Sequence, residues 1–250
     1  MSLGSLVRLW GAVAFEPELG RLDDICRAGH QLRRSAETWN HWETNRLSVT
    51  LRDTAGRKLM SLGHRGISYE TINPDDLERV VGQMAADIHE AIRQLKINGL
   101  TRMGFQLCTY KDIGIRFDEL LARFKPLCLP SRGKLEEIAT RGAKDLSLVV
   151  DYEAGGLSAK LRAGPMKQDQ GLRILGSSGS HESLFEPLTK SKAIADLYDC
   201  VPEDFLFFDV DVFREGDIRP DEWTSFVDDA KAHACDMLLT VENSLLEKEE

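Results

Sequence analysis

Residues 204–223, DFLFFDVDVFREGDIRPDEW, carry the strongest structural signal in the chain. In the first half of this stretch apolar residues alternate with Asp209 and Asp211, as in a strand with one buried face. Its end, IRPDEW at 218–223, places a proline where a helix would begin, and the missing proline N–H costs nothing there. A similar signal, INPDDL, occurs at 72–77. The echo predicts that the chain contains two copies of one structural unit.

The two copies are expected at residues 1–99 and 100–250, the second with an insertion at about 165–202. Each is expected to run β-α-β-β-(β)-α. Period-two alternation is typical of antiparallel sheets with one solvated face, and amphipathic helices would cover the other face. The predicted fold class is therefore α+β, with long helices packed on one face of antiparallel sheet. The expected strands are 6–15, 46–52, 58–69, 101–110, 145–152, 157–163 and 205–213, and the expected helices are 19–35, 74–97, 117–124, 189–199 and 223–245, with a helical turn at 134–140.

Local signals set the expected ends of these elements. Asn73 is the expected N-cap of the helix that starts at Pro74, and Asn98 and Gly99 are expected to close that helix. Pro126 is expected to interrupt the helix that begins near residue 117. The long strand 58–69 is expected to break at a glycine.

Composition excludes several classes of protein. The formal net charge of −9 argues against a broad phosphate-binding surface, which needs clustered Lys and Arg. No apolar run approaches the roughly 20 residues that a membrane-spanning helix needs. The chain has five cysteines, none close to another in sequence. This spacing predicts free thiols in a reducing cytoplasm rather than a disulfide framework.

A family resemblance adds to these expectations. The strand that contains Arg102, Met103, Gly104 and Phe105, the later strand Phe208–Phe213 and a C-terminal helix with a central histidine (His233) resemble a sporadically distributed family of uncharacterised bacterial proteins. The resemblance implies a bacterial accessory protein and brings no activity with it. Each half of the chain is also similar to a TATA-binding-protein-like or helix-grip unit.

Asp209 and Asp211 are the best candidates for metal chemistry, because they share one face of a strand and Glu215 and Asp217 follow them. Clustered carboxylates can bind Mg²⁺ or Mn²⁺ for phosphoryl transfer. The favoured alternative is that they form the solvated face of an amphipathic strand. The loop GSSGSHES at 176–183 lacks the ending of a phosphate-binding loop and is interpreted as surface. No catalytic residue and no cofactor are predicted.

Three tryptophans are candidates for partner binding. Trp10 falls on the strand face opposite Leu9, while Trp39 and Trp42 flank a connection. Exposed aromatic residues often anchor a partner. The alternative is packing in the core, where tryptophan is usually found.

These observations favour a non-enzymatic binding or accessory protein that acts through a sheet surface or a cleft between sheet and helices. Another protein is the expected partner, although a small-molecule ligand and a homodimer remain open, and no membrane partner is expected. One alternative is a metal-dependent enzyme that uses Asp209 and Asp211 on phosphate-containing substrates. A second is nucleic-acid binding through the sheet, which the net charge of −9 disfavours.

Overall fold

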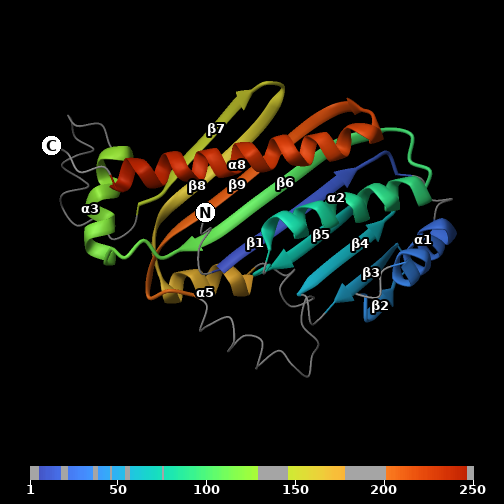
Figure 1. Ribbon diagram of the computed structural model, residues 1–250, viewed down its shortest axis with the longest axis horizontal. Helices are drawn as coiled ribbons and strands as arrows, with labels where there is room; N and C mark the ends of the chain where they lie inside the picture. Colours follow the sequence, from blue (N-terminus) through green and yellow to red (C-terminus); the bar gives the residue numbers. More distant parts are fainter. Residues whose placement is uncertain are drawn as a thin grey trace.

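The computed structural model describes residues 6–17, 22–35, 39–45, 47–53, 57–74, 76–128, 146–177 and 201–246. In this part of the chain nine strands form one open sheet in the order β2-β3-β4-β5-β1-β6-β9-β8-β7, and all neighbouring strands are antiparallel (Figure 1). The predicted α+β class is confirmed. The strands are β1 (Leu6–Ala14), β2 (His41–Thr44), β3 (Ser48–Asp53), β4 (Lys58–Gly63), β5 (Gly66–Ile72), β6 (Leu100–Lys111), β7 (Leu148–Ala154), β8 (Leu157–Lys167) and β9 (Asp204–Ile218).

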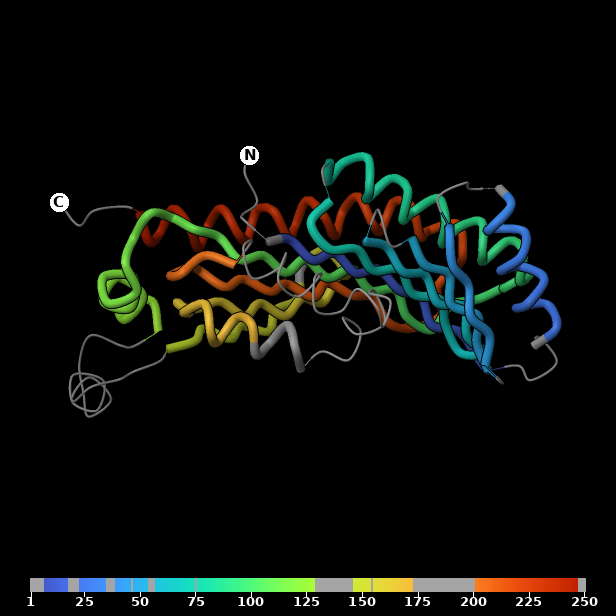
Figure 2. The backbone as a smooth tube through the Cα atoms, turned by 90° about the horizontal axis from the view of Figure 1, so that it is seen from below, coloured from blue at the N-terminus to red at the C-terminus, as the bar shows by residue number. Residues whose placement is uncertain are grey.

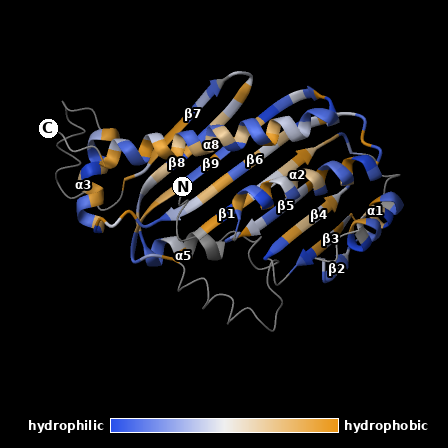
Figure 3. Cartoon of the chain, in the orientation of Figure 1, coloured by the Kyte–Doolittle hydropathy of each residue, from blue (hydrophilic) through white to orange (hydrophobic). Residues whose placement is uncertain are grey.

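Two long helices, α2 (Leu77–Gln94) and α8 (Trp223–Leu246), lie side by side across one face of this sheet (Figures 1 and 2). Hydrophobic and hydrophilic residues alternate around both helices, as Figure 3 shows by colour. The apolar stripe of each helix faces the apolar side of the strands and forms one continuous core. The indole of Trp223 is fully buried in it and donates a hydrogen bond of 3.1 Å from Nε1 to the Ala85 carbonyl, which joins α8 to α2.

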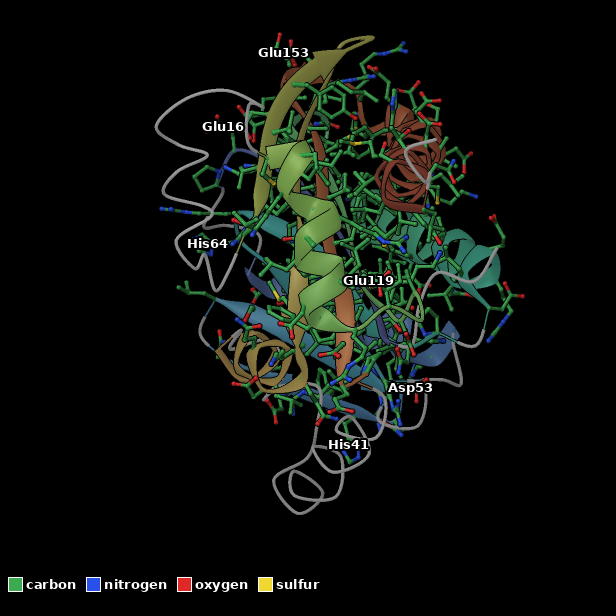
Figure 4. The ribbon with its side chains drawn as sticks, turned by 90° about the vertical axis from the view of Figure 1, so that its left-hand side faces the viewer. Glu16, His41, Asp53, His64, Glu119 and Glu153 are labelled. Carbon is green, nitrogen blue, oxygen red and sulfur yellow. The ribbon has the colours of Figure 1, made fainter. Side chains whose placement is uncertain are left out.

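The shorter helices complete the helical layer and reach the opposite face. Helix α1 (Leu22–Ser35) packs beside α2 against β3, and α3 (Phe117–Cys128) lies at the opposite end, against β8. Helix α5 (Gln168–Ser177) lies on the face of the sheet away from α2 and α8. Figure 4, which looks along the sheet from α3, shows the long helices on one side of the strands and α5 on the other.

Within the described residues, the main elements follow one another in a similar order before and after residue 99. A strand, a helix, three strands and a long helix follow one another as β1, α1, β3, β4, β5, α2 and again as β6, α3, β7, β8, β9, α8, with β2 and α5 as additions. In each half the first strand lies next to the last strand. Strands β1 and β6 then pair with each other near the centre of the sheet.

Several predicted boundaries are wrong. Asn73 does not cap α2, because its backbone has a φ of 48° and its amide oxygen accepts a hydrogen bond of 2.7 Å from Val7 N on β1. Asp76 caps the helix instead, with its carboxylate accepting a hydrogen bond of 3.1 Å from Arg79 N. The helix ends at Gln94, several residues before Asn98 and Gly99. Helix α3 continues through Pro126, which has no N–H to donate to the carbonyl of residue 122, but only two helical residues follow it.

Other predictions are confirmed or fall outside the described residues. The expected break in strand 58–69 is confirmed, because β4 ends at Gly63 and β5 begins at Gly66. Part of the predicted insertion is helix α5. The predicted helix at 189–199, the helical turn at 134–140 and most of the loop at 176–183 lie outside the described residues.

Candidate binding surface on the open sheet face

The face of the sheet away from α2 and α8 carries the polar residues of each strand. On β1, Leu9 and Val13 point into the core, so period two sends Arg8 and Trp10 to the other side. Strand pairing then aligns such residues in rows across the sheet. One row contains, in order from β5 to β7, Glu70, Trp10, Gln106, Asp211, Lys160 and Asp151.

Part of this face is covered. Tyr110 and Phe205 form a second apolar cluster with Val201, against which Leu172 of α5 packs. Helix α5 approaches closely because residue 171 is glycine: a Cβ there would lie 2.6 Å from Phe205 Cζ and 2.9 Å from Tyr110 Cε1. The central part of the face, over β1 and β6, lies beyond this cluster. It forms the candidate binding surface.

A hollow of about 380 Å³ opens on this surface. Its floor contains small residues, since Ala12 of β1 pairs with Gly104 of β6 and Ala14 is two positions further along β1, opposite Arg102. The indole of Trp10 reaches the floor, because a Cβ added to Gly104 would lie 3.5 Å from Trp10 Cζ3. The longer side chains around the hollow are Arg8, Trp10, Arg102, Gln106 and Asp211.

The arginines of the surface are already close to carboxylates. Arg8 Nε donates a hydrogen bond of 2.6 Å to Glu70 Oε1. The guanidinium of Arg102 lies 3.7 Å from Asp211 Oδ2, 3.4 Å from Glu215 Oε1 and 4.6 Å from the centroid of the Phe213 ring. Among the described residues, the hollow is therefore lined by charges of both signs close together.

Asp209 and Asp211 are partly buried on this face, on neighbouring outward positions of β9. Burial raises the pKa of both carboxyl groups. Asp209 Oδ1 accepts a hydrogen bond of 2.8 Å from Gln106 Nε2. Asp211 differs, because its Oδ1 is buried and finds no hydrogen-bond donor within the described part of the chain. Asp211 therefore has acceptor capacity that the described residues do not use.

The two aspartates are not joined by further metal ligands in the described residues, where no group of three or more His, Cys, Asp or Glu side chains is placed to hold a metal ion. Glu215 and Asp217 follow on the same strand, but Glu215 is next to Arg102. A metal site at Asp209 and Asp211 stays a prediction.

The three candidate tryptophans lie in three different places. Trp10 lines the hollow. Trp39 is only 3% exposed and packs edge-on against Tyr69 in the core, as the packing alternative predicts. Trp42 is 39% exposed on the edge strand β2, with its ring 6.0 Å from that of His30. Of the three, Trp10 alone belongs to the candidate binding surface.

Sequence reasoning missed Arg8, Arg102 and Gln106 as members of this surface. Alternation along β1 and β6 places each of them on the solvated face, and that signal was available. Alternation does not predict that Trp10 pairs with Gln106 or that Gln106 pairs with Asp211, because these pairings require β1, β6 and β9 to be neighbours. Strand order is not encoded in local alternation.

Two other hollows open near the ends of strands. One, of about 300 Å³, lies where α3 begins and β8 meets α5, and four acidic and two basic residues line it: Asp118, Asp169, Glu203, Asp204, Arg116 and Lys167. The other, of about 460 Å³, lies beside Phe15, Gly99 and Asp217. No tryptophan lines either hollow among the described residues.

Comparisons with known proteins do not add a family. No model of a known protein family matches the chain, and no curated protein matches it. No helix in the described residues is long and apolar enough to cross a membrane. The findings identify an α+β fold with a nine-stranded antiparallel sheet.

Proposed function

We propose that the protein is a non-enzymatic binding protein, and that a partner protein docks on the open sheet face at the hollow beside Trp10. One observation carries this proposal: the hollow brings Trp10, Arg8 and Arg102 together over a floor of alanine and glycine. Tryptophan and arginine are enriched among the residues that dominate binding energy at protein interfaces.

The charges of the surface support a protein partner over a nucleic acid. Arg8 and Arg102 each have an acidic neighbour, and the whole chain has a net charge of −9. Binding to a phosphate backbone depends on unneutralised Lys and Arg. A protein surface, which carries both signs, matches this pattern better. The four described cysteines are free thiols, which supports the cytoplasmic setting predicted from the sequence.

The proposal is tested by affinity purification of the tagged protein from its native host, with quantitative comparison of wild type, Trp10→Ala and Trp42→Ala. Trp42 is the matched control, because it is an exposed tryptophan outside the hollow. We expect a specific partner to be lost with Trp10→Ala, since truncation of a central anchor costs about 2 kcal/mol or more, roughly 30-fold in Kd. The partner should be retained with Trp42→Ala.

Two results would contradict the proposal. The first is a partner whose measured Kd is the same for wild type and Trp10→Ala. The second is turnover of a phosphate-containing substrate that needs Mg²⁺ or Mn²⁺ and is abolished by Asp209→Asn, which would favour the enzyme alternative. Analytical ultracentrifugation at several concentrations distinguishes a homodimer from a complex with another protein. If the homodimer used the same face, Trp10→Ala would dissociate it.

We also infer that the halves, residues 1–99 and 100–250, are two copies of a helix-grip or TATA-binding-protein-like unit. The repeated order of elements and the adjacency of the first and last strands in both halves support this inference. Two separate chains with these boundaries should associate through the β1–β6 pairing when expressed together. Failure of the co-expressed halves to form a folded complex would count against two self-contained units.

A further inference from the structure

The hollow beside Trp10 has a definite shape and chemistry, from which the kind of group that fills it can be inferred. The inference rests on the proposed function, because it concerns the same surface. The small floor of Ala12, Ala14 and Gly104 leaves about 380 Å³ of space, within the range of sites that bind compact ligands. The indole of Trp10 bounds this space on one side, and the guanidinium of Arg102 lines it as well.

These two groups favour a flat aromatic ring. An indole attracts another ring in stacked or edge-to-face geometry. A guanidinium adds a favourable contact with the face of a ring, and Arg102 already makes such a contact with Phe213, at 4.6 Å from the centroid. The alanine and glycine floor offers apolar contact without polar groups that a ring would desolvate. A ring over this floor would therefore contact Trp10 and Arg102 together.

The charges around the hollow disfavour an anchor that is itself charged. A lysine or arginine of the partner would approach Arg8 and Arg102. A glutamate or aspartate would approach Asp211 and Glu215, which lie 3.7 and 3.4 Å from Arg102. Like charges placed together at an interface are costly. A neutral group avoids both repulsions.

Asp211 adds a requirement for a hydrogen-bond donor. Its Oδ1 is buried, so a bound group would meet Oδ2, which lies 3.7 Å from Arg102, longer than a good charge-assisted hydrogen bond. Asp211 lines the hollow, so a donor on a bound group can approach its carboxylate. A phenol O–H or an indole N–H can supply that donor on an aromatic ring, whereas a phenyl ring cannot.

We propose that the partner protein anchors itself by inserting a tyrosine or tryptophan side chain into the hollow beside Trp10, with the ring against Trp10 and the O–H or N–H donating to Asp211. The ring provides contact area, and the hydrogen bond to Asp211 provides selectivity for these two residues over phenylalanine. The Asp211 carboxylate then gains a well-placed donor only in the complex.

The proposal is tested by NMR titration of the full-length, ¹⁵N-labelled protein with N-acetyl-tyrosinamide, N-acetyl-tryptophanamide, N-acetyl-phenylalaninamide, N-acetyl-argininamide and adenosine. The indole N–H signal of Trp10, assigned by its loss in Trp10→Phe, reports on the hollow, and that of Trp42 is the internal control. The shift of the Trp10 signal gives a Kd for each amide. We expect the Kd of the tyrosine and tryptophan amides to be about tenfold lower than that of the phenylalanine amide, from the net strength of one hydrogen bond to a charged acceptor. In Asp211→Ala the ratio of the Kd values for the phenylalanine amide and the tyrosine amide should fall close to one, while the Trp10 signal still shifts.

Each other outcome overturns the inference. Equal binding of the phenylalanine and tyrosine amides would remove the role of Asp211, and tighter binding of the arginine amide would show a cation site. Tighter binding of adenosine would show a site for a free heterocycle, and no shift of Trp10 with any probe would show that the hollow takes no ring. None of these results affects the proposed function if the partner is still lost with Trp10→Ala. If the partner binds Trp10→Ala as well as wild type, both proposals fail.

Discussion

The spacing between the sheet and α2 leads to a quantitative prediction at Gly11, in the middle of β1. A Cβ at this position would lie 2.5 Å from Met84 Sδ, 3.0 Å from its Cε and 3.3 Å from its Cγ. Met84 is on α2 and is fully buried, so it has little room to move away. Overpacking of this kind costs about 1–3 kcal/mol. The lower entropy of alanine in the unfolded chain returns about 0.4–1 kcal/mol. We therefore expect Gly11→Ala to lower the free energy of unfolding by about 1–2 kcal/mol.

A double-mutant cycle identifies the cause. Met84→Ala alone should cost about 2–5 kcal/mol because it opens a cavity in the core. In that background the methyl group of Gly11→Ala enters the vacated space, so its cost should vanish or change sign, with a coupling energy of about 1–2 kcal/mol. Gly82 is the matched control: it lies in α2 and is exposed, and apart from its own stretch of helix no described atom lies within 4 Å of the position that an added methyl group would take. Gly82→Ala should stabilise the protein by about 1 kcal/mol through helix propensity.

Urea denaturation, followed by both circular dichroism and tryptophan fluorescence, measures these changes, and coincident transitions justify a two-state treatment. For a chain of this size each kcal/mol should also shift Tm by about 2–4 °C. The reasoning is refuted if Gly11→Ala is neutral in the wild-type background. It is refuted equally if Gly11→Ala is as costly with Met84→Ala as without it.

Three further predictions concern single buried groups. Burial raises the pKa of Asp87, so the stability that this carboxyl group contributes is complete below its unfolded pKa of about 3.9 and is lost as the pH rises through the higher folded pKa. Asp87→Asn should therefore unfold at a higher urea concentration than wild type at pH 7. The difference between the two proteins should shrink toward pH 4. Trp223→Phe should cost about 2–3 kcal/mol in urea denaturation, because it removes the hydrogen bond to Ala85 and leaves a cavity between α2 and α8; a loss below half a kcal/mol would contradict this. Cys26 is exposed, whereas Cys108 is buried and its burial raises the pKa of its thiol. A thiol reagent should therefore modify Cys26 in the native protein and Cys108 only on unfolding, as measured by peptide mass spectrometry.

Local periodicity was sufficient to predict the α+β class and the two faces of the strands. Alternation places Asp209 and Asp211 on the face opposite Val210 and Val212, and the structure has them there. This works because side chains alternate strictly along an extended backbone, whatever the strand pairs with. Helix ends were predicted less well. At Asn73 a contact with Val7, far away in sequence, displaced the expected capping bond, and Asp76 made that bond instead.

The tertiary structure alone decided which residues meet. Trp10, Trp39 and Trp42 are the same residue type, yet one lines the hollow, one is buried against Tyr69 and one is exposed on an edge strand. Gly11 and Gly82 differ in the same way, because only the packing of α2 on β1 makes a methyl group costly at the first and harmless at the second. The sequence by itself determines the alternation of each strand and the apolar stripe of each helix, which are local properties of the backbone. Strand order and helix placement bring together residues that are distant in the chain, and these contacts decide where the hollow lies and which side chains surround it.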